Sequence, residues 1–363
     1  IEVIKGADSI TAGSGALGGA VMFTTKDPYD YLAAEGNDSY FRVRTGYTSS
    51  TEEAMTTATL ANRTGIVESM LVYTLRKGHE AESWYDDTPV QTGSERRTPD
   101  PIDRDSDNVL AKVDFVLNDA HRLGVVAERG RTTNEINNLS RVGGAGYLER
   151  RADDENDRDR YGVRYQWQDA GTFFDSLEWT ADRGETKSRG LTTILAGTGC
   201  AQDIVPCLRS EDRATEQSLN RTALDFSKVW GSGQVHHSLV YGLAWQQRDV
   251  EFSAVDTRYI GTTQDTASVT IDPNQVPQTD VTDINLYLRD SVYLLNDRLT
   301  LHGGVRYDRT EYSPRIDELF PDGTGTVRDV EFSAPSWLAG IDFEFTTGHS
   351  LWAQVGGGFR APA

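Results

Sequence analysis

The sequence predicts an all-β protein that forms part of a transmembrane antiparallel β-barrel. From about residue 39 onward, apolar and polar residues alternate in short runs separated by turn residues, with almost no helical periodicity. The mean hydropathy is −0.52, and the absence of an apolar stretch of about 18 residues excludes a transmembrane helix. A barrel strand needs only about 9 to 11 residues and exposes every second side chain to lipid, so a barrel remains compatible with this composition.

Three segments show the alternation most clearly. Their apolar faces consist of Leu239, Tyr241, Leu243 and Trp245 in 237–246, of Leu299, Leu301, Val305 and Tyr307 in 299–308, and of Trp337, Ala339, Ile341, Phe343 and Phe345 in 337–345. The opposite faces of the last two segments carry His302, Arg306, Asp308, Asp342 and Glu344. Charges on the second face do not suit the core of a β-sandwich, but they suit a hydrated lumen.

About 13 candidate strands are connected alternately by short and long segments. The short turns lie at 62–65, 118–121, 168–171, 230–236, 295–297 and 346–349, and the long links lie near 81–107, 137–156, 193–214, 255–281 and 315–332. One connection on the side of the long links is an exception: the first one, "SSTEE" at 49–53, is short. This rhythm is typical of tight periplasmic turns and long extracellular loops. Most tryptophans fall near strand ends, as an aromatic girdle requires.

Charge and cysteine content limit the partners and the compartment. The formal net charge is −20, which argues against nucleic acid as a partner because phosphate binding needs clustered Lys and Arg. The two cysteines, Cys200 and Cys207, stand in "GCAQDIVPCLR" without a His or a third Cys that would complete a zinc site. A disulfide-closed loop in an oxidising compartment is the favoured interpretation, and two buried thiols or a weak metal pair are the alternatives.

The first residues, "IEVIKGADSI", show no signal peptide and are typical of the middle of a domain, so we expect the chain to be a fragment. A glycine-rich turn follows, with Gly13, Gly15, Gly18 and Gly19 in "GSGALGG", and then "TTKDPYDYL" at 24–32. No Lys follows the glycines at Walker spacing, which argues against a phosphate loop. This succession resembles the end of the plug domain of TonB-dependent outer-membrane receptors, closest to the haem, haemoglobin and transferrin/lactoferrin branch.

At the other end of the chain, Phe359, Arg360, Ala361 and Pro362 resemble the FRAP box of haem receptors in that family. In those receptors the box precedes an extracellular loop with a haem-ligand His and then an NPNL box, both of which would follow Ala363. A thirteenth strand that starts from the periplasm delivers this box to the cell surface, where a loop for extracellular haem has to begin. Side-chain alternation predicts that Arg360 faces the lumen, either bracing the barrel or guiding the ligand.

The resemblance implies a barrel of about 22 strands around a plug, in the outer membrane of a Gram-negative cell. Residues 1–32 would then be the C-terminal part of the plug, and 33–363 the N-terminal part of the barrel. It also implies a transporter for haem or haemoprotein-derived haem rather than an enzyme, energised by TonB, in contact with outer-membrane lipid and carrying haem as cargo rather than as an intrinsic cofactor. No nucleophile or zinc-hydrolase motif occurs in the sequence.

Histidine commonly ligates haem iron, and only His79, in "LRKGHEAESWY", is expected at an extracellular strand end. We expect the other five histidines at periplasmic turns or low in the lumen: His121, His236, His237, His302 and His349. The acidic run 152–159 lacks the spacing of a calcium loop, so we expect it in a solvated loop and expect no metal site.

Three other functions remain open from the sequence. The first keeps the receptor type and changes the cargo to a ferric siderophore or to iron from transferrin. A passive porin or surface adhesin would share the barrel but would not explain the plug-like opening residues. A soluble β-sandwich would have to expose the charged alternate faces of its strands.

Overall fold

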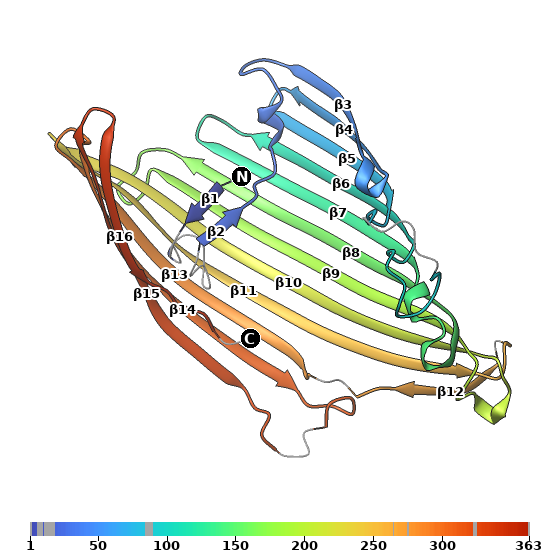
Figure 1. Ribbon diagram of the computed structural model, residues 1–363. Coiled ribbons are helices and arrows are strands. Elements are labelled where there is room, and N and C mark those ends of the chain that lie inside the picture. Colours follow the sequence, from blue (N-terminus) through green and yellow to red (C-terminus); the bar gives the residue numbers. More distant parts are fainter. Residues whose placement is uncertain are drawn as a thin grey trace.

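The computed structural model describes residues 2–5, 10, 19–83, 90–263, 265–273, 276–321 and 325–361. It shows one strongly curved antiparallel sheet of 14 strands, open along β3 and β16 (Figure 1). Thirteen of the strands pair in chain order, as expected, and the short β12 pairs only with β11. None of the helices in the described part of the chain has the length and apolar composition needed to cross a membrane.

The strands of this sheet range in length from 6 residues in β12 to 26 residues in β10. They are β3 (Asp38–Thr48), β4 (Glu53–Thr64), β5 (Val67–His79), β6 (Ile102–Val116), β7 (His121–Asn137), β8 (Tyr147–Gln168), β9 (Ser176–Ala196), β10 (Cys207–Ser232), β11 (Val235–Tyr259), β12 (Thr266–Ile271), β13 (Gln278–Leu294), β14 (Leu299–Arg315), β15 (Val330–Thr346) and β16 (His349–Gly357). Single turns of 3₁₀ helix lie at Pro28–Asp30 (η1), Ser49–Thr51 (η2), Leu139–Arg141 (η3), Gly144–Gly146 (η4) and Ala201–Asp203 (η5).

The connections alternate between short and long from β4 onward, which confirms the predicted rhythm. We call the side of the short connections the turn end of the sheet and the side of the long ones the loop end. The loops are shorter than predicted because the strands continue into them. The loop expected at 137–156 covers only 138–146, and the one expected at 193–214 only 197–206.

The two faces of the sheet differ in polarity along each strand. On β14, Val305 and Tyr307 are 57% and 46% exposed on the convex face, whereas Arg306 and Asp308 are 7% and 4% exposed on the concave face. The same alternation holds on β11, β13 and β15, where the exposed residues include Leu243, Trp245, Ile284, Leu286, Trp337 and Ile341. The predicted faces are therefore confirmed, with an apolar band outside and charges inside.

Strands β8 to β11 contain 21 to 26 residues each, about twice the length that crosses a bilayer. Their loop-end halves carry opposite charges that pair across strands on the convex face, such as Lys187 with Glu216 and Arg189 with Asp212. The expectation that the acidic run 152–159 lies in a loop is wrong, because these residues belong to β8. Arg131 of β7 pairs with Glu155 and Asp157 of this run, and such cross-strand pairs stabilise a sheet in water.

Aromatic rings form a continuous row near the turn end of β7 to β11. The ring centroids of His121 and Trp167 are 5.5 Å apart, those of Trp167 and Phe174 5.0 Å, those of Phe174 and Phe226 5.6 Å, and those of Phe226 and Tyr241 4.9 Å. Amphipathic rings of this kind favour the boundary between lipid and water. The row therefore marks the edge of the apolar band that faces the turn end of the sheet.

A small core closes the tips of β9 and β10 at the loop end. Cys200 and Cys207 form a disulfide with their Cα atoms 5.7 Å apart. Cys207 is 1% exposed and packs with Ile194 and Ala196, which are equally buried, and with Tyr147 at the start of β8. The disulfide thus holds the loop 197–206 against a packed tip.

Replacing both Cys200 and Cys207 by Ser should loosen this loop without disturbing the sheet, because the bridge closes a ring that lies outside the paired strands. In the full-length protein, limited proteolysis should cut 197–206 faster, and the heat-dependent electrophoretic shift of the folded sheet should stay unchanged. Neither Cys200 nor Cys207 of the wild-type protein should react with a maleimide before reduction. A reactive thiol in the unreduced protein would contradict this account.

Candidate functional site at the junction on the concave face

The chain enters the large sheet through a segment at 23–37, which we call the junction segment. It follows the β1 (Glu2–Lys5) and β2 (Gly19–Met22) hairpin, which lies on the concave side of the sheet (Figure 1). Pro28 starts η1, where a fixed φ suits the first helical position. The Asp30 carboxylate accepts a hydrogen bond from the Asp27 backbone N–H at 2.8 Å. This local turn leaves the Asp27 side chain free to point at the sheet.

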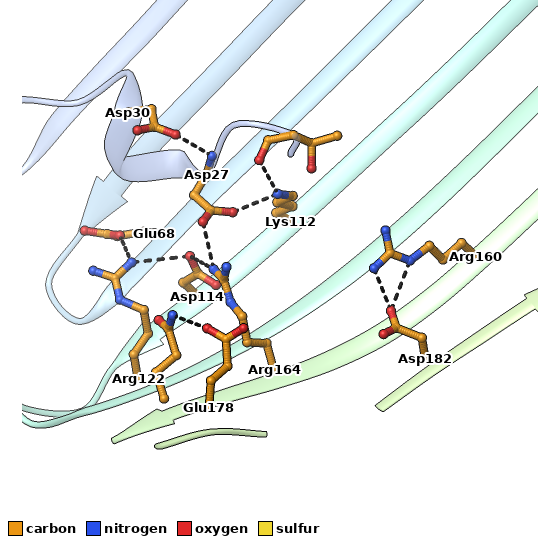
Figure 2. Close-up of polar contacts among 12 residues, drawn as sticks. Asp27, Asp30, Glu68, Lys112, Asp114, Arg122, Arg160, Arg164, Glu178 and Asp182 are labelled. Atoms are coloured by element: carbon orange, nitrogen blue, oxygen red, sulfur yellow. Dashed lines mark hydrogen bonds and ion pairs between the residues drawn. The ribbon is translucent and has the colours of Figure 1, made fainter. Parts of the chain in front are cut away.

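The Asp27 carboxylate contacts two cations of the sheet (Figure 2). Lys112 Nζ of β6 donates to Asp27 Oδ1 at 2.7 Å, and Arg164 Nη2 of β8 donates to Asp27 Oδ2 at 3.0 Å. Lys112 also donates to the Thr25 carbonyl oxygen at 3.2 Å. Asp27 is only 5% exposed, so its charge is balanced by these two partners rather than by water.

A second layer of ion pairs supports the first. Arg122 of β7 donates to Glu68 Oε2 at 2.9 Å and lies 3.4 Å from Asp114 Oδ2, while Arg164 lies 3.8 Å from the same oxygen. Glu68 and Asp114 are each 2% exposed. Together with Asp27 and Lys112, these residues form a junction network of three carboxylates and three cations: Asp27, Glu68, Lys112, Asp114, Arg122 and Arg164 (Figure 2).

Two further contacts hold the rest of the junction segment. Arg63 of β4 pairs with Glu68 Oε1 at 2.7 Å and donates to the carbonyl oxygens of Ala33 and Gly36. Gly124 lies beside Asp114, and a Cβ at this position would collide with the Asp114 carboxylate. Close approach of the carboxylate to the backbone therefore requires glycine here.

The junction network controls the ionisation of Asp27. Burial alone would raise its pKa, but the hydrogen bond from Lys112 and the charges of Arg164 and Lys112 outweigh burial and hold the pKa below the ordinary value. Asp27 is therefore ionised at any pH at which an ordinary aspartate is. A cavity of about 260 Å³ borders Asp27, Lys112 and Arg164 and continues to Asp182, which binds Arg160 at 2.7 Å.

A second contact joins the N-terminal hairpin region to the far side of the concave face. Ile10 is 1% exposed and packs on Gly304 of β14. Arg306 Nη1 donates to the Ile10 carbonyl oxygen at 3.2 Å while its Nε holds Asp308 at 2.8 Å. The residues before β3 therefore contact the sheet at β4 to β8 and again at β14.

The sequence-predicted residues do not gather at this site. His79 ends β5 on the convex face, the same face as Leu71, Tyr73 and Leu75, and its Nδ1 lies 3.0 Å from Asp103 Oδ1. Phe359 follows β16 and donates its backbone N–H to Ser336 Oγ at 3.1 Å. Arg360 is exposed and Ala361 half-buried.

Of the predicted plug glycines, Gly19 pairs with Lys5 in the hairpin, while Gly13, Gly15 and Gly18, like Pro362, lie outside the described residues. No group of three or more metal-ligating side chains occurs among the residues that the structure describes.

Sequence analysis did not identify the junction network. The only local pattern in the sequence that points to it is a pair of charged residues, Lys112 and Asp114, on one face of a strand whose other face is apolar. The partners lie 85 residues away for Lys112 and Asp27 and 137 residues away for Arg164 and Asp27, so no spacing rule connects them.

Comparison with known proteins gives one family. The family described as "TonB dependent receptor-like, beta-barrel" matches residues 83–363. Among curated relatives, the haemoglobin-haptoglobin utilization protein B of Neisseria meningitidis serogroup C is 27% identical over all of this chain and 49% of its own length. The haemoglobin-haptoglobin-binding protein A of Haemophilus influenzae is 38% identical over 39% of this chain and 13% of its own.

Among solved structures, the FrpB iron transporter of Neisseria meningitidis (F3-3 variant) superimposes with a TM-score of 0.70 at 18% identity. The superposition covers 99% of this chain and 53% of that one. At 18% identity, this structural similarity shows that the two chains share a fold and shows nothing more. The chain spans about half the length of the full-length relative and of this structure.

Replacing Asp27 by Asn should release the junction segment, because Lys112 and Arg164 would lose their shared anion while still half-buried. The cost of breaking a buried ion pair is about 3 kcal/mol. A spin label on Cys introduced at Thr24 of the full-length protein should become mobile in the Asn variant. The label should stay immobile in the control Asp119→Asn, which changes an aspartate in the exposed turn between β6 and β7.

The same label should report a pH dependence. Because the pKa of Asp27 is lowered in the docked state, its contribution is fully present above the ordinary aspartate pKa of about 3.9 and is lost as the pH falls further. The wild-type label should therefore stay immobile from pH 7 to 5 and become mobile only below about pH 4. Release between pH 7 and 5 would show that another group controls docking.

Proposed function

The chain belongs to the TonB-dependent receptor β-barrel family of the outer membrane, and on this premise we propose that it is part of a receptor that takes up haem, either free or from a haemoprotein. The observation that supports haem as the cargo is the match along the whole chain to a relative named for haemoglobin-haptoglobin utilization. The residues Phe359 to Ala361, with their likeness to a haem-receptor motif, support the same cargo.

In this proposal, residues 1–32 are the end of the plug and 33–363 the first strands of the barrel. The concave face is the lumen and the loop end is extracellular, because the charged halves of β8 to β11 extend beyond the apolar band at that end. The loops bind the cargo, and TonB supplies the force that rearranges the plug. The receptor binds and moves haem without changing it chemically, so it is not an enzyme.

The junction network supports the assignment of 1–32 to a plug. A buried carboxylate with two cation partners keeps the end of the plug on the inner wall at β6 and β8, so the rest of the plug can move while this end stays attached. The geometry around Phe359 supports an ordered start of the next extracellular loop, because its backbone is tied to the fully buried Ser336.

A second candidate is the same receptor type with iron in another form, a ferric siderophore or transferrin iron. The observation in its favour is the fold shared with a solved iron transporter. It has less support because that structure is only 18% identical to this chain.

A titration of the complete receptor with haem should separate the two cargoes. Axial ligation of the iron should give a shifted and saturable Soret band, and haem-dependent growth should disappear when TonB is deleted. Nonspecific broadening of the band would favour the iron alternative, whereas growth on haem without TonB would exclude TonB-driven uptake altogether.

The variant His79→Ala should leave the shifted band unchanged, because His79 lies on the convex face and holds Asp103. His302→Ala, which changes a lumen-facing histidine that hydrogen-bonds Ser291 at 2.9 Å near the turn end, is the matched control. Loss of the band in His79→Ala alone would instead assign this residue as an axial ligand.

A further inference from the structure

A hollow of about 710 Å³ lies on the convex face of the sheet, away from the lumen and its plug. It crosses β6 to β11, in the middle of the sheet, so the open edges at β3 and β16 do not contribute to it. The floor is made by small side chains in adjacent strands, among them Ala111, Ala127 and Ala181. Tyr161, Arg183 and Trp245 line the same hollow.

The strand register explains why the surface is hollow at this place. Ala111 pairs with Ala127, Ala127 with Tyr161, and Tyr161 with Arg183. The next row toward the turn end runs from Val163 through Ala181 to Thr222 and Trp245. Tyr161 is 58% exposed and Trp245 36%, so two large rings stand on either side of a floor of small side chains.

The hollow lies at the loop-end edge of the apolar band. Toward the turn end the same face carries Val125 and Trp179, whereas toward the loop end the next row carries Arg129, Asp159 and Glu185. This is the level at which the hydrocarbon of the outer leaflet gives way to lipid head groups, because charged side chains are tolerated only at and beyond that boundary.

Arg183 differs from the other cations of this face. Lys187 and Arg189, farther along β9, pair with Glu216 and Asp212. The neighbours of Arg183 across the strands are Tyr161 and Asn220, and among the described residues no carboxylate lies within ion-pair distance of it. An exposed guanidinium at the edge of an apolar hollow matches an amphiphile with an apolar chain and an anionic head.

We propose that this hollow binds a phosphorylated lipid of the outer leaflet, with an acyl chain between Tyr161 and Trp245 and a phosphate on Arg183. A guanidinium presents parallel N–H donors that match phosphate oxygens, which a choline or an uncharged sugar cannot exploit. The lipid belongs to the receptor's outer wall and is separate from its cargo, which passes on the other face of the sheet. The site rests on the membrane location of the family and on the proposed extracellular position of the loop end.

Native mass spectrometry of the complete receptor in mild detergent tests this site, with bisphosphorylated lipid A and its dephosphorylated form as probes. The wild type should retain the bisphosphorylated lipid in preference to the dephosphorylated one. Arg183→Gln should reduce that retention by about tenfold, the effect of one charge-assisted hydrogen bond. Arg189→Gln, which removes a cation already paired with Asp212, should retain the lipid like the wild type.

Ala181→Leu fills the floor and should reduce retention of both lipids, while the heat-dependent electrophoretic shift shows that the barrel is folded. Equal retention of the two lipids by the wild type, or unchanged retention in Arg183→Gln, would overturn the phosphate contact. Unchanged retention in Ala181→Leu, or a second receptor copy in place of lipid, would overturn the proposal that the hollow holds the acyl chain. None of these readouts involves haem, so they are independent of the proposed cargo.

Discussion

The pairing of backbone groups inside a membrane is the constraint on which the rest of this structure depends. Water is absent from the hydrocarbon, so each N–H and C=O there needs a partner in the protein. The chain meets this requirement by pairing strands in sequence order. Paired strands direct alternate side chains to opposite faces, and the lipid-facing band and the charged lumen wall both follow from that geometry.

The lumen wall then has to accommodate charge without bulk water around it. Glu68 and Asp114 are almost fully buried, and each is matched by Arg122, with Arg63 and Arg164 completing the balance. Unpaired, such carboxylates would strongly destabilise the fold. The same requirement gives the junction segment its position, because Asp27 is the anion that Lys112 and Arg164 need from outside the sheet.

Local patterns predicted the strands, their faces and their alternating connections, because each depends on residues only one or two positions apart. The loop boundaries were predicted less well, since hydrophilic residues such as Asp157 and Asp159 pair across strands with Arg131 and Arg129 and continue the sheet beyond the membrane. The junction network depends on register between distant strands, and no sequence spacing carries that information. The apolar hollow likewise exists only once Ala111 and Ala127 are placed side by side.

The two attachments of the N-terminal segment differ in strength, and this difference determines which of them gives way first under force. Ile10 is held by packing and one hydrogen bond from Arg306, whereas Asp27 is held by two cations in a buried network. A force applied from the N-terminal side reaches the weaker attachment first. Movement of the hairpin away from β14 would then stop at Asp27, because separating a buried anion from two cations costs more than breaking one hydrogen bond to a carbonyl oxygen.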